Sequence, residues 1–177
     1  MQCTSQCKAQ KVAWLGWARQ STGYHTIMAL STEQLLRTAD TLEKALSEIA
    51  LLPSHTRSHE QDIFFDLYRN AAIKSFELSL ETAGKLLRKA LKAFNASTRD
   101  VDSLVFNDVL RHAGKHSLLD ESAVTRWITY RTNRNSTAHD YGVVFANETL
   151  ALLPNYLKDL RELAAKIQGV FDAADAS

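Results

Sequence analysis

The clearest helical pattern lies in residues 31–53, STEQLLRTADTLEKALSEIALLP. Ser31-x-x-Gln34 has the residue types of a capping box, in which two side chains satisfy backbone N–H groups at a helix start. Apolar residues then recur every three or four positions, at Leu35, Ala39, Leu42, Leu46, Ile49 and Leu52. This spacing gathers them on one helix face, and Pro53 is typical of a residue just past a helix end. The pattern predicts an amphipathic helix that packs against others.

Four more helices are expected downstream. The same periodicity places them at about 58–94, 98–114, from 120 or 122 past Trp127, and 143–171. We expect Thr98 to cap the third helix, Gly114 to end it, and Pro154 to bend the last one. Five helices with short connections predict an all-α, antiparallel bundle. The expected domain covers 31–172, and 173–177 is a short tail.

Composition agrees with a helical protein. The chain has 177 residues, enough for one domain with a sizeable core, and only six Gly and two Pro. The sequence contains no run of 18 consecutive apolar residues, so no membrane span is expected. Cys3 and Cys7 are the only cysteines, too few for a disulfide framework. A reducing, cytoplasmic setting is the simpler expectation.

Residues 1–30 differ from the rest of the chain. They hold Trp14 and Trp17 without sustained periodicity, so we expect an extension that is disordered or non-native, with a native helical tail as the alternative. This segment contains three of the 21 basic residues and no acid, which leaves 18 basic and 20 acidic residues, a balance of −2. A domain that bound nucleic acid through bulk charge would be more basic. Any such function must rest on a local site.

The residues richest in chemistry are 134–141, RNSTAHDY, which bring together Arg134, Asn135, His139 and Tyr141. Arginine binds phosphate through a permanently charged guanidinium, and histidine moves a proton near neutral pH. Five positions on an ideal helix leave Arg134 and His139 roughly 140° apart, so one straight helix would not present both. We therefore place the run between the fourth and fifth helices, with His139 near a helix start that favours phosphate. A polar loop with a surface arginine and a capping histidine is the alternative.

Other polar clusters have less specific patterns. The spacing of a zinc pair occurs at His55 with His59 and at His112 with His116. Neither pair has a clear third ligand, so no metal site is expected. A basic stretch is formed by Lys85, Arg88, Lys89 and Lys92. It is either a solvated helix face or a guide for an RNA backbone. Glu77 and Glu81 share one face and repel each other, so we expect partners for them, with Lys85 and Arg134 as candidates.

These residues resemble the HEPN superfamily, and within it the nucleotidyltransferase substrate-binding proteins and HepT-like toxins. The resemblance rests on Arg-Asn-x-x-x-His-x-Tyr, with Trp127 seven residues before Arg134, and on Phe76-Glu77-x-x-x-Glu81-x-x-x-Lys85 in the second helix. Residues 99–119 resemble the family's third helix and turn, and the likeness covers roughly 31–170. Gly84 departs from the bulky aromatic residue often found there, which puts local packing in doubt.

The resemblance implies an all-α protein that dimerises and works with a minimal nucleotidyltransferase. In HepT-like members the helical protein is a ribonuclease toxin, which the transferase silences by attaching AMP to a tyrosine two places after the histidine. Tyr141 matches that position. No cofactor or metal is implied.

The resulting hypothesis is metal-independent cleavage of RNA. His139 would be the general base, Arg134 would stabilise the phosphate charge, and Asn135 would orient the phosphate or the imidazole. Supporting roles are assigned to Glu77, Glu81, Lys85 and Arg131. Two alternatives remain: a non-catalytic module that presents a nucleotide to the transferase, and a plain helical scaffold.

Overall fold

In the ranges described by the computed structural model, residues 31–53, 56–94, 97–137 and 143–176, every regular element is helical. The elements are α2 (Thr32–Leu51), α3 (His59–Leu91), the short 3-10 turn η2 (Lys92–Phe94), α4 (Thr98–Ser103), α5 (Phe106–Lys115), α6 (Glu121–Thr137) and α7 (Val143–Asp175). The predicted all-α fold is therefore confirmed. None of these helices is long and apolar enough to cross a membrane.

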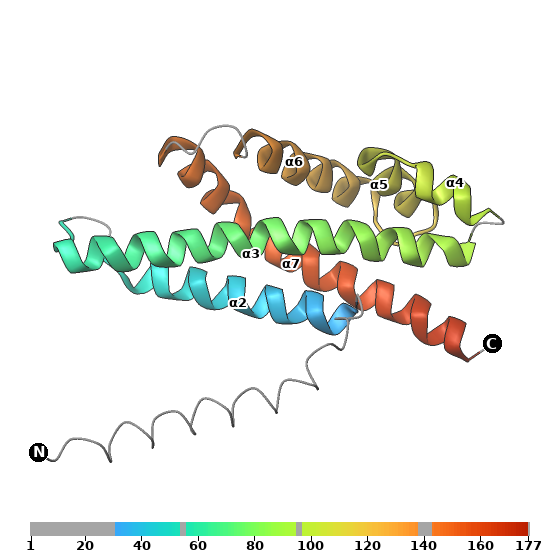
Figure 1. The fold of residues 1–177 in the computed structure, drawn as a ribbon, viewed down its shortest axis with the longest axis horizontal. Coiled ribbons are helices and arrows are strands. Elements are labelled where there is room, and N and C mark those ends of the chain that lie inside the picture. Colours follow the sequence, from blue (N-terminus) through green and yellow to red (C-terminus); the bar gives the residue numbers. More distant parts are fainter. Residues whose placement is uncertain (1–30, 54–55, 95–96, 138–142, 177) are drawn as a thin grey trace, which may run out of the picture.

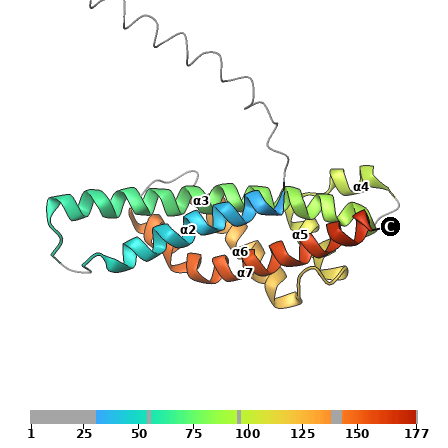
Figure 2. The same ribbon diagram turned by 90° about the horizontal axis from the view of Figure 1, so that it is seen from below.

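The long helices form an antiparallel bundle around α3. In Figure 1, α2 and α6 run in one direction while α3 and α7 run in the other. Helix α3 packs against α2, α5 and α7, and α6 packs against α5 and α7. In Figure 2, α2 and α7 both run alongside α3, and α2 also packs against α7.

The first two helices begin where their capping residues predict. The Ser31 hydroxyl accepts a hydrogen bond from the Gln34 backbone N–H at 3.2 Å. At the start of α3, Ser58 and Gln61 form a complete capping box, with bonds of 3.3 and 2.9 Å. These bonds satisfy backbone donors that a helix start leaves without partners. Local sequence thus fixes both helix starts.

The prediction of one continuous third helix over residues 98–114 is wrong. Two helices, α4 and α5, replace it, because Leu104 and the following residue adopt extended backbone angles. The Arg88 guanidinium donates to the Leu104 carbonyl at 2.9 Å, which satisfies an acceptor freed by the interruption. The cap of α4 is also Ser97 rather than Thr98, since the Ser97 hydroxyl accepts from the Asp100 N–H.

Gly114 does not end the helix as expected. It lies inside α5, which continues to Lys115. A Cβ atom at Gly114 would lie 3.1 Å from Val124 Cγ2 in α6. The glycine therefore serves the close approach of α5 and α6 rather than a helix stop.

An aromatic cluster occupies the centre of the core. The Tyr156 ring lies edge-on to Phe76, Tyr130 and Trp127, with centroids 4.8, 5.1 and 5.6 Å away. Edge-to-face contacts of this kind add to the gain from burial. Trp127 is fully buried and belongs to this core. The Tyr156 hydroxyl is 2.8 Å from the Ser79 hydroxyl, so the buried phenol has a polar partner.

Helix α7 remains continuous through Pro154. In Figure 1 its ribbon changes direction between its orange first part and its red second part. An internal proline removes one hydrogen bond and bends a helix in this way.

Candidate functional site

One face of α6 carries the site arginine. Ala123, Trp127, Tyr130 and Arg134 follow one another at spacings of four, three and four residues, so they share one side of the helix. The first three are buried, and Arg134 is half-buried. Arg134 therefore continues the inward-facing side of α6 past the end of the core.

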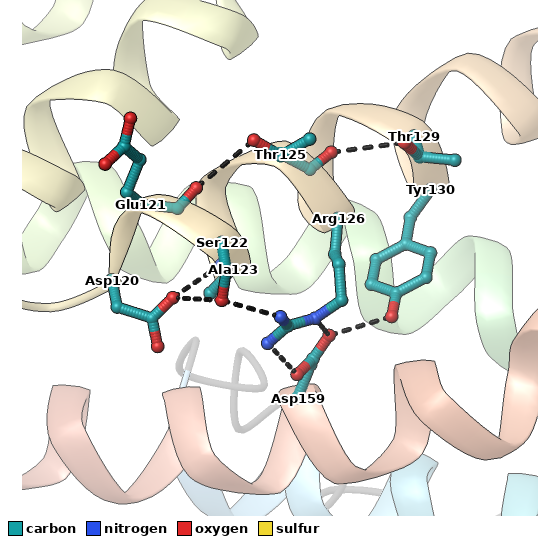
Figure 3. A network of polar contacts seen from close by, with 9 residues as sticks. All are labelled: Asp120, Glu121, Ser122, Ala123, Thr125, Arg126, Thr129, Tyr130 and Asp159. Atoms are coloured by element: carbon teal, nitrogen blue, oxygen red, sulfur yellow. Dashed lines mark hydrogen bonds and ion pairs between the residues drawn. The ribbon is translucent and has the colours of Figure 1, made fainter.

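An ion pair holds α6 against α7, as Figure 3 shows. Arg126 donates two hydrogen bonds of 2.8 Å to the two carboxylate oxygens of Asp159. The Tyr130 hydroxyl donates a third, also of 2.8 Å. Bidentate, charge-assisted bonds of this kind fix orientation as well as distance. Burial, together with the bond to Asp159, raises the pKa of Tyr130.

The start of α6 is held by the same network (Figure 3). Asp120 accepts from the Ala123 backbone N–H at 2.7 Å and from the Ser122 hydroxyl at 2.6 Å. These two bonds, the Ser122 bond above all, lower the pKa of Asp120. Arg126 in turn donates to the Ser122 hydroxyl at 2.9 Å. Capping and ion pairing thus form one continuous network along the first half of α6.

A second polar link ties the far end of α6 to α7. The buried Thr149 hydroxyl donates to the Asn133 side-chain oxygen at 2.9 Å. Sequence reasoning did not single out Asn133, because its role depends on a partner 16 residues away. The link fixes the turn of α6 that carries Arg134.

Charges from α3 and α6 meet beside this turn. Lys85 donates to Glu81 at 2.6 Å, and this bond is the main reason that the pKa of Glu81 is lowered. Attraction from Arg134 and Arg131 lowers it further. Glu81 is thus within electrostatic reach of both arginines. Glu77, by contrast, pairs with Lys74 at 3.3 Å.

Arg131 lies over an aromatic ring. Its guanidinium carbon is 4.9 Å from the ring centroid of Phe106, the first residue of α5. Burial lowers the pKa of Arg131, as does repulsion from Arg134 and Arg88, and Glu81 opposes the change. Arginine keeps its charge in proteins even so. The arrangement can bind an anion such as phosphate.

The remaining members of the predicted site lie at or beyond the end of α6. Asn135 is exposed in its last turn. His139 and Tyr141 lie outside the described residues, between Thr137 and Val143. That Arg134, His139 and Tyr141 form one site therefore stays a prediction.

The side chains of the basic stretch, on α3 and the adjoining η2, contact partners within the protein. Lys85 binds Glu81, Arg88 binds the Leu104 carbonyl, Lys89 lies 4.7 Å from the Phe171 ring centroid, and Lys92 lies 2.8 Å from Asp102. These partners favour a structural role for the stretch over the guidance of an RNA backbone. His116, from one of the zinc-like pairs, stacks on Phe94 at 4.9 Å.

Comparison with known proteins identifies the family. Residues 37–169 match the family model described as nucleotidyltransferase substrate binding protein like. A curated relative, the probable ribonuclease HepT of Haemophilus influenzae, is 30% identical over 86 residues. That match covers 49% of this chain and 58% of the relative.

Two solved structures share the fold. One, from Haemophilus influenzae, is described as the fold of a substrate-binding domain of a nucleotidyltransferase. Its TM-score is 0.67 at 24% identity, and the match covers 78% of this chain and 99% of that one. The other, from Thermus thermophilus, has a TM-score of 0.51 at 23% identity, with coverage of 71% and 98%. Since the family model spans most of the bundle, the chain belongs to the family of nucleotidyltransferase substrate-binding-like proteins.

Proposed function

We propose that this protein is a metal-independent endoribonuclease that works as the toxin of a pair with a nucleotidyltransferase. The observation that carries the proposal is that Arg131, held over the Phe106 ring, and Arg134 lie three residues apart on the part of α6 that precedes His139 in the sequence. The similarity to a probable ribonuclease supports the same choice.

His139 would take a proton from a ribose 2′-OH, whose oxygen attacks the adjacent phosphorus. Arg134 would stabilise the charge that develops on the non-bridging oxygens. The bond to the 5′-oxygen breaks, giving a 2′,3′-cyclic phosphate and a 5′-hydroxyl. The nucleophile belongs to the RNA itself, so the reaction needs no metal-activated water.

In this scheme, the described residues of one protomer offer no evident general acid for the departing 5′-oxygen. A two-fold dimer would bring a second His139 and a second Arg134 to the same cleft. One imidazole would then accept the proton while the other donates one. In this scheme, the dimer is needed because it supplies the second imidazole as the general acid.

The cleavage test uses purified protein and a labelled single-stranded RNA in excess EDTA. Wild type should produce 2′,3′-cyclic phosphate ends, and His139→Ala should lower the rate by at least about 100-fold. His116→Ala is the matched control, because His116 stacks on Phe94 and has no role in the scheme. Equal cleavage by wild type and His139→Ala, or none by either, rejects the proposal.

The transferase would switch the enzyme off by attaching AMP to Tyr141. The added phosphodiester would lie two residues from His139, and its negative charge could occupy Arg134 in place of RNA. Incubation with the transferase and ATP should add the mass of one AMP per chain, and Tyr141→Phe should abolish the gain. A mass gain that persists in Tyr141→Phe excludes this site.

A second function, a non-catalytic module that presents a nucleotide to the transferase, is favoured by two observations. The four basic side chains of the α3 stretch contact partners inside the protein, and the chain after residue 30 has a balance of −2. Here Arg134 and His139 would only bind phosphate. Toxicity on expression that His139→Ala relieves would distinguish the enzyme from this module.

A further inference from the structure

The ring of Phe106 lies directly on the backbone of α3. A Cβ atom built at Gly84 would lie 2.5 Å from Phe106 Cε2 and 3.1 Å from Cδ2. No real side chain tolerates the shorter distance, so only glycine permits this contact. The aromatic group expected on α3 at position 84 is in effect supplied from α5 instead.

The interruption between α4 and α5 puts Phe106 in this place. Phe106 begins α5 immediately after the extended residues Leu104 and Val105. Arg88 of α3 holds that junction through the Leu104 carbonyl at 2.9 Å. The position of the ring is therefore fixed from two sides by α3.

The same ring supports Arg131, whose guanidinium carbon lies 4.9 Å from its centroid. A cation over an aromatic face is attracted to it, more strongly where water is partly excluded. Arg131 and Arg134 are three residues apart on α6, so their Cβ atoms are about 5–6 Å apart. Among the described residues, no carboxylate or carbonyl accepts a hydrogen bond from Arg131, so its donors are available to a ligand.

We propose that Phe106 is a positioning residue that holds Arg131 beside Arg134, so that both guanidiniums bind phosphates of one single-stranded RNA. Gly84 makes this possible because it has no side chain that would collide with the Phe106 ring. The inference rests on the proposed function for the choice of RNA as ligand. Arg131 contributes binding, whereas Arg134 and His139 contribute chemistry.

A double-mutant cycle tests the proposal on the full chain. The probe is a fluorescent single-stranded RNA with 2′-O-methyl riboses, which cannot be cleaved by 2′-oxygen attack, and binding is followed by anisotropy. Arg131→Gln should weaken binding about tenfold and lower the slope of log affinity against log salt by about one. Phe106→Leu should weaken it about three- to tenfold. Because Phe106 acts through Arg131, the double variant should bind no more weakly than Arg131→Gln.

Controls separate positioning from general packing. Phe106→Tyr keeps the aromatic face and should stay within about twofold of wild type. Phe94→Leu removes a different half-exposed ring, which stacks on His116, and should have no effect. If circular dichroism shows Phe106→Leu to be unfolded, Phe106→Met serves in its place.

Effects of Phe106→Leu and Arg131→Gln that multiply in the double variant would overturn the inference, as would no binding by wild type. Cleavage of unmodified RNA is measured in parallel. Arg131-dependent binding without cleavage contradicts the proposed function and leaves the inference intact. Cleavage without Arg131-dependent binding contradicts the inference alone.

Discussion

Asp159 is the residue on which the position of α6 depends. Its side chain is only 9% exposed, whereas that of its partner Arg126 is 41% exposed. Arg126 also contacts Ser122, so it can keep a polar partner if the carboxylate is removed. Without Arg126, the side chain of Asp159 would keep only the hydroxyl of Tyr130 as a hydrogen-bond partner among the described residues. Loss of Arg126 should therefore lower the free energy of unfolding more than loss of the Asp159 carboxylate.

We expect Arg126→Met to lower the free energy of unfolding by about 2–4 kcal/mol, because it leaves a buried carboxylate without its countercharge. Asp159→Asn should cost less, about 1–2 kcal/mol, since the amide oxygen still accepts a hydrogen bond and the guanidinium reaches water. Urea unfolding measures both values. Arg37→Met, at an exposed pair with Glu33, is the control and should change stability by less than about 0.5 kcal/mol. A larger loss in Asp159→Asn than in Arg126→Met would contradict the argument.

Tyr156 should make the protein sensitive to alkaline pH. Burial raises the pKa of Tyr156, although its bond with Ser79 opposes the change. Above about pH 10 the unfolded chain loses the phenol proton while the folded protein keeps it. The unfolded state then binds fewer protons, so stability is fully present below about pH 10 and falls by about 1.4 kcal/mol per pH unit above it. Tyr156→Phe should lose about 1 kcal/mol at about pH 8 and show a shallower decline between about pH 10 and 11 in urea unfolding. An unchanged decline would show that this phenol does not set the alkaline limit.

At the scale of helices, local signals predicted some features and tertiary contacts determined the rest. Ser31 and Ser58 cap helices because their partners lie three residues away in sequence. The break at Leu104 was not predictable, because Arg88, 16 residues earlier, satisfies its carbonyl. The role of Phe106 was likewise not predictable, because it depends on contacts with Gly84 of α3 and Arg131 of α6. Glu81, Lys85 and Arg131 were expected on helices and lie there, whereas Arg134 was expected between two helices and lies inside α6 instead, because that helix continues to Thr137. The aromatic support of Arg131 was not predicted.

The contact between α3 and α5 yields a prediction at Gly84. Alanine is a better helix former than glycine by about 1 kcal/mol, so Gly84→Ala would help an isolated helix. Against Phe106, however, the added methyl group would be overpacked, and we expect a net loss of about 1–3 kcal/mol. At Gly169 in α7, an added Cβ would meet no neighbouring atom within 4 Å, so Gly169→Ala should be neutral or stabilising by up to about 1 kcal/mol. Thermal and urea unfolding compare the two. A stabilising Gly84→Ala would show that Phe106 moves aside freely.

At the scale of the whole molecule, one face of α3 links the site to an exposed apolar surface. Ile63, Leu67 and Leu78 are 55%, 58% and 49% exposed. Their spacing of four and eleven residues places them on the same side of α3 as Glu81 and Lys85. A second copy packed on this face would cover the apolar side chains and bring two charged clusters together, as an isologous two-fold contact does.

If two copies pack on this face, Leu67→Lys should convert the dimer to a monomer, because it places a charge in the middle of that face. Sedimentation velocity at a few micromolar measures the change, and the free energy of unfolding of the monomer should show that the bundle is intact. Leu51→Lys is the matched control, since Leu51 is 78% exposed at the end of α2 and should leave the dimer unchanged. If the site is shared between protomers, Leu67→Lys should lose RNA cleavage together with dimerisation, and raising its concentration should restore both in parallel. A monomeric Leu67→Lys that cleaves RNA at the wild-type rate would show that one chain holds the complete site.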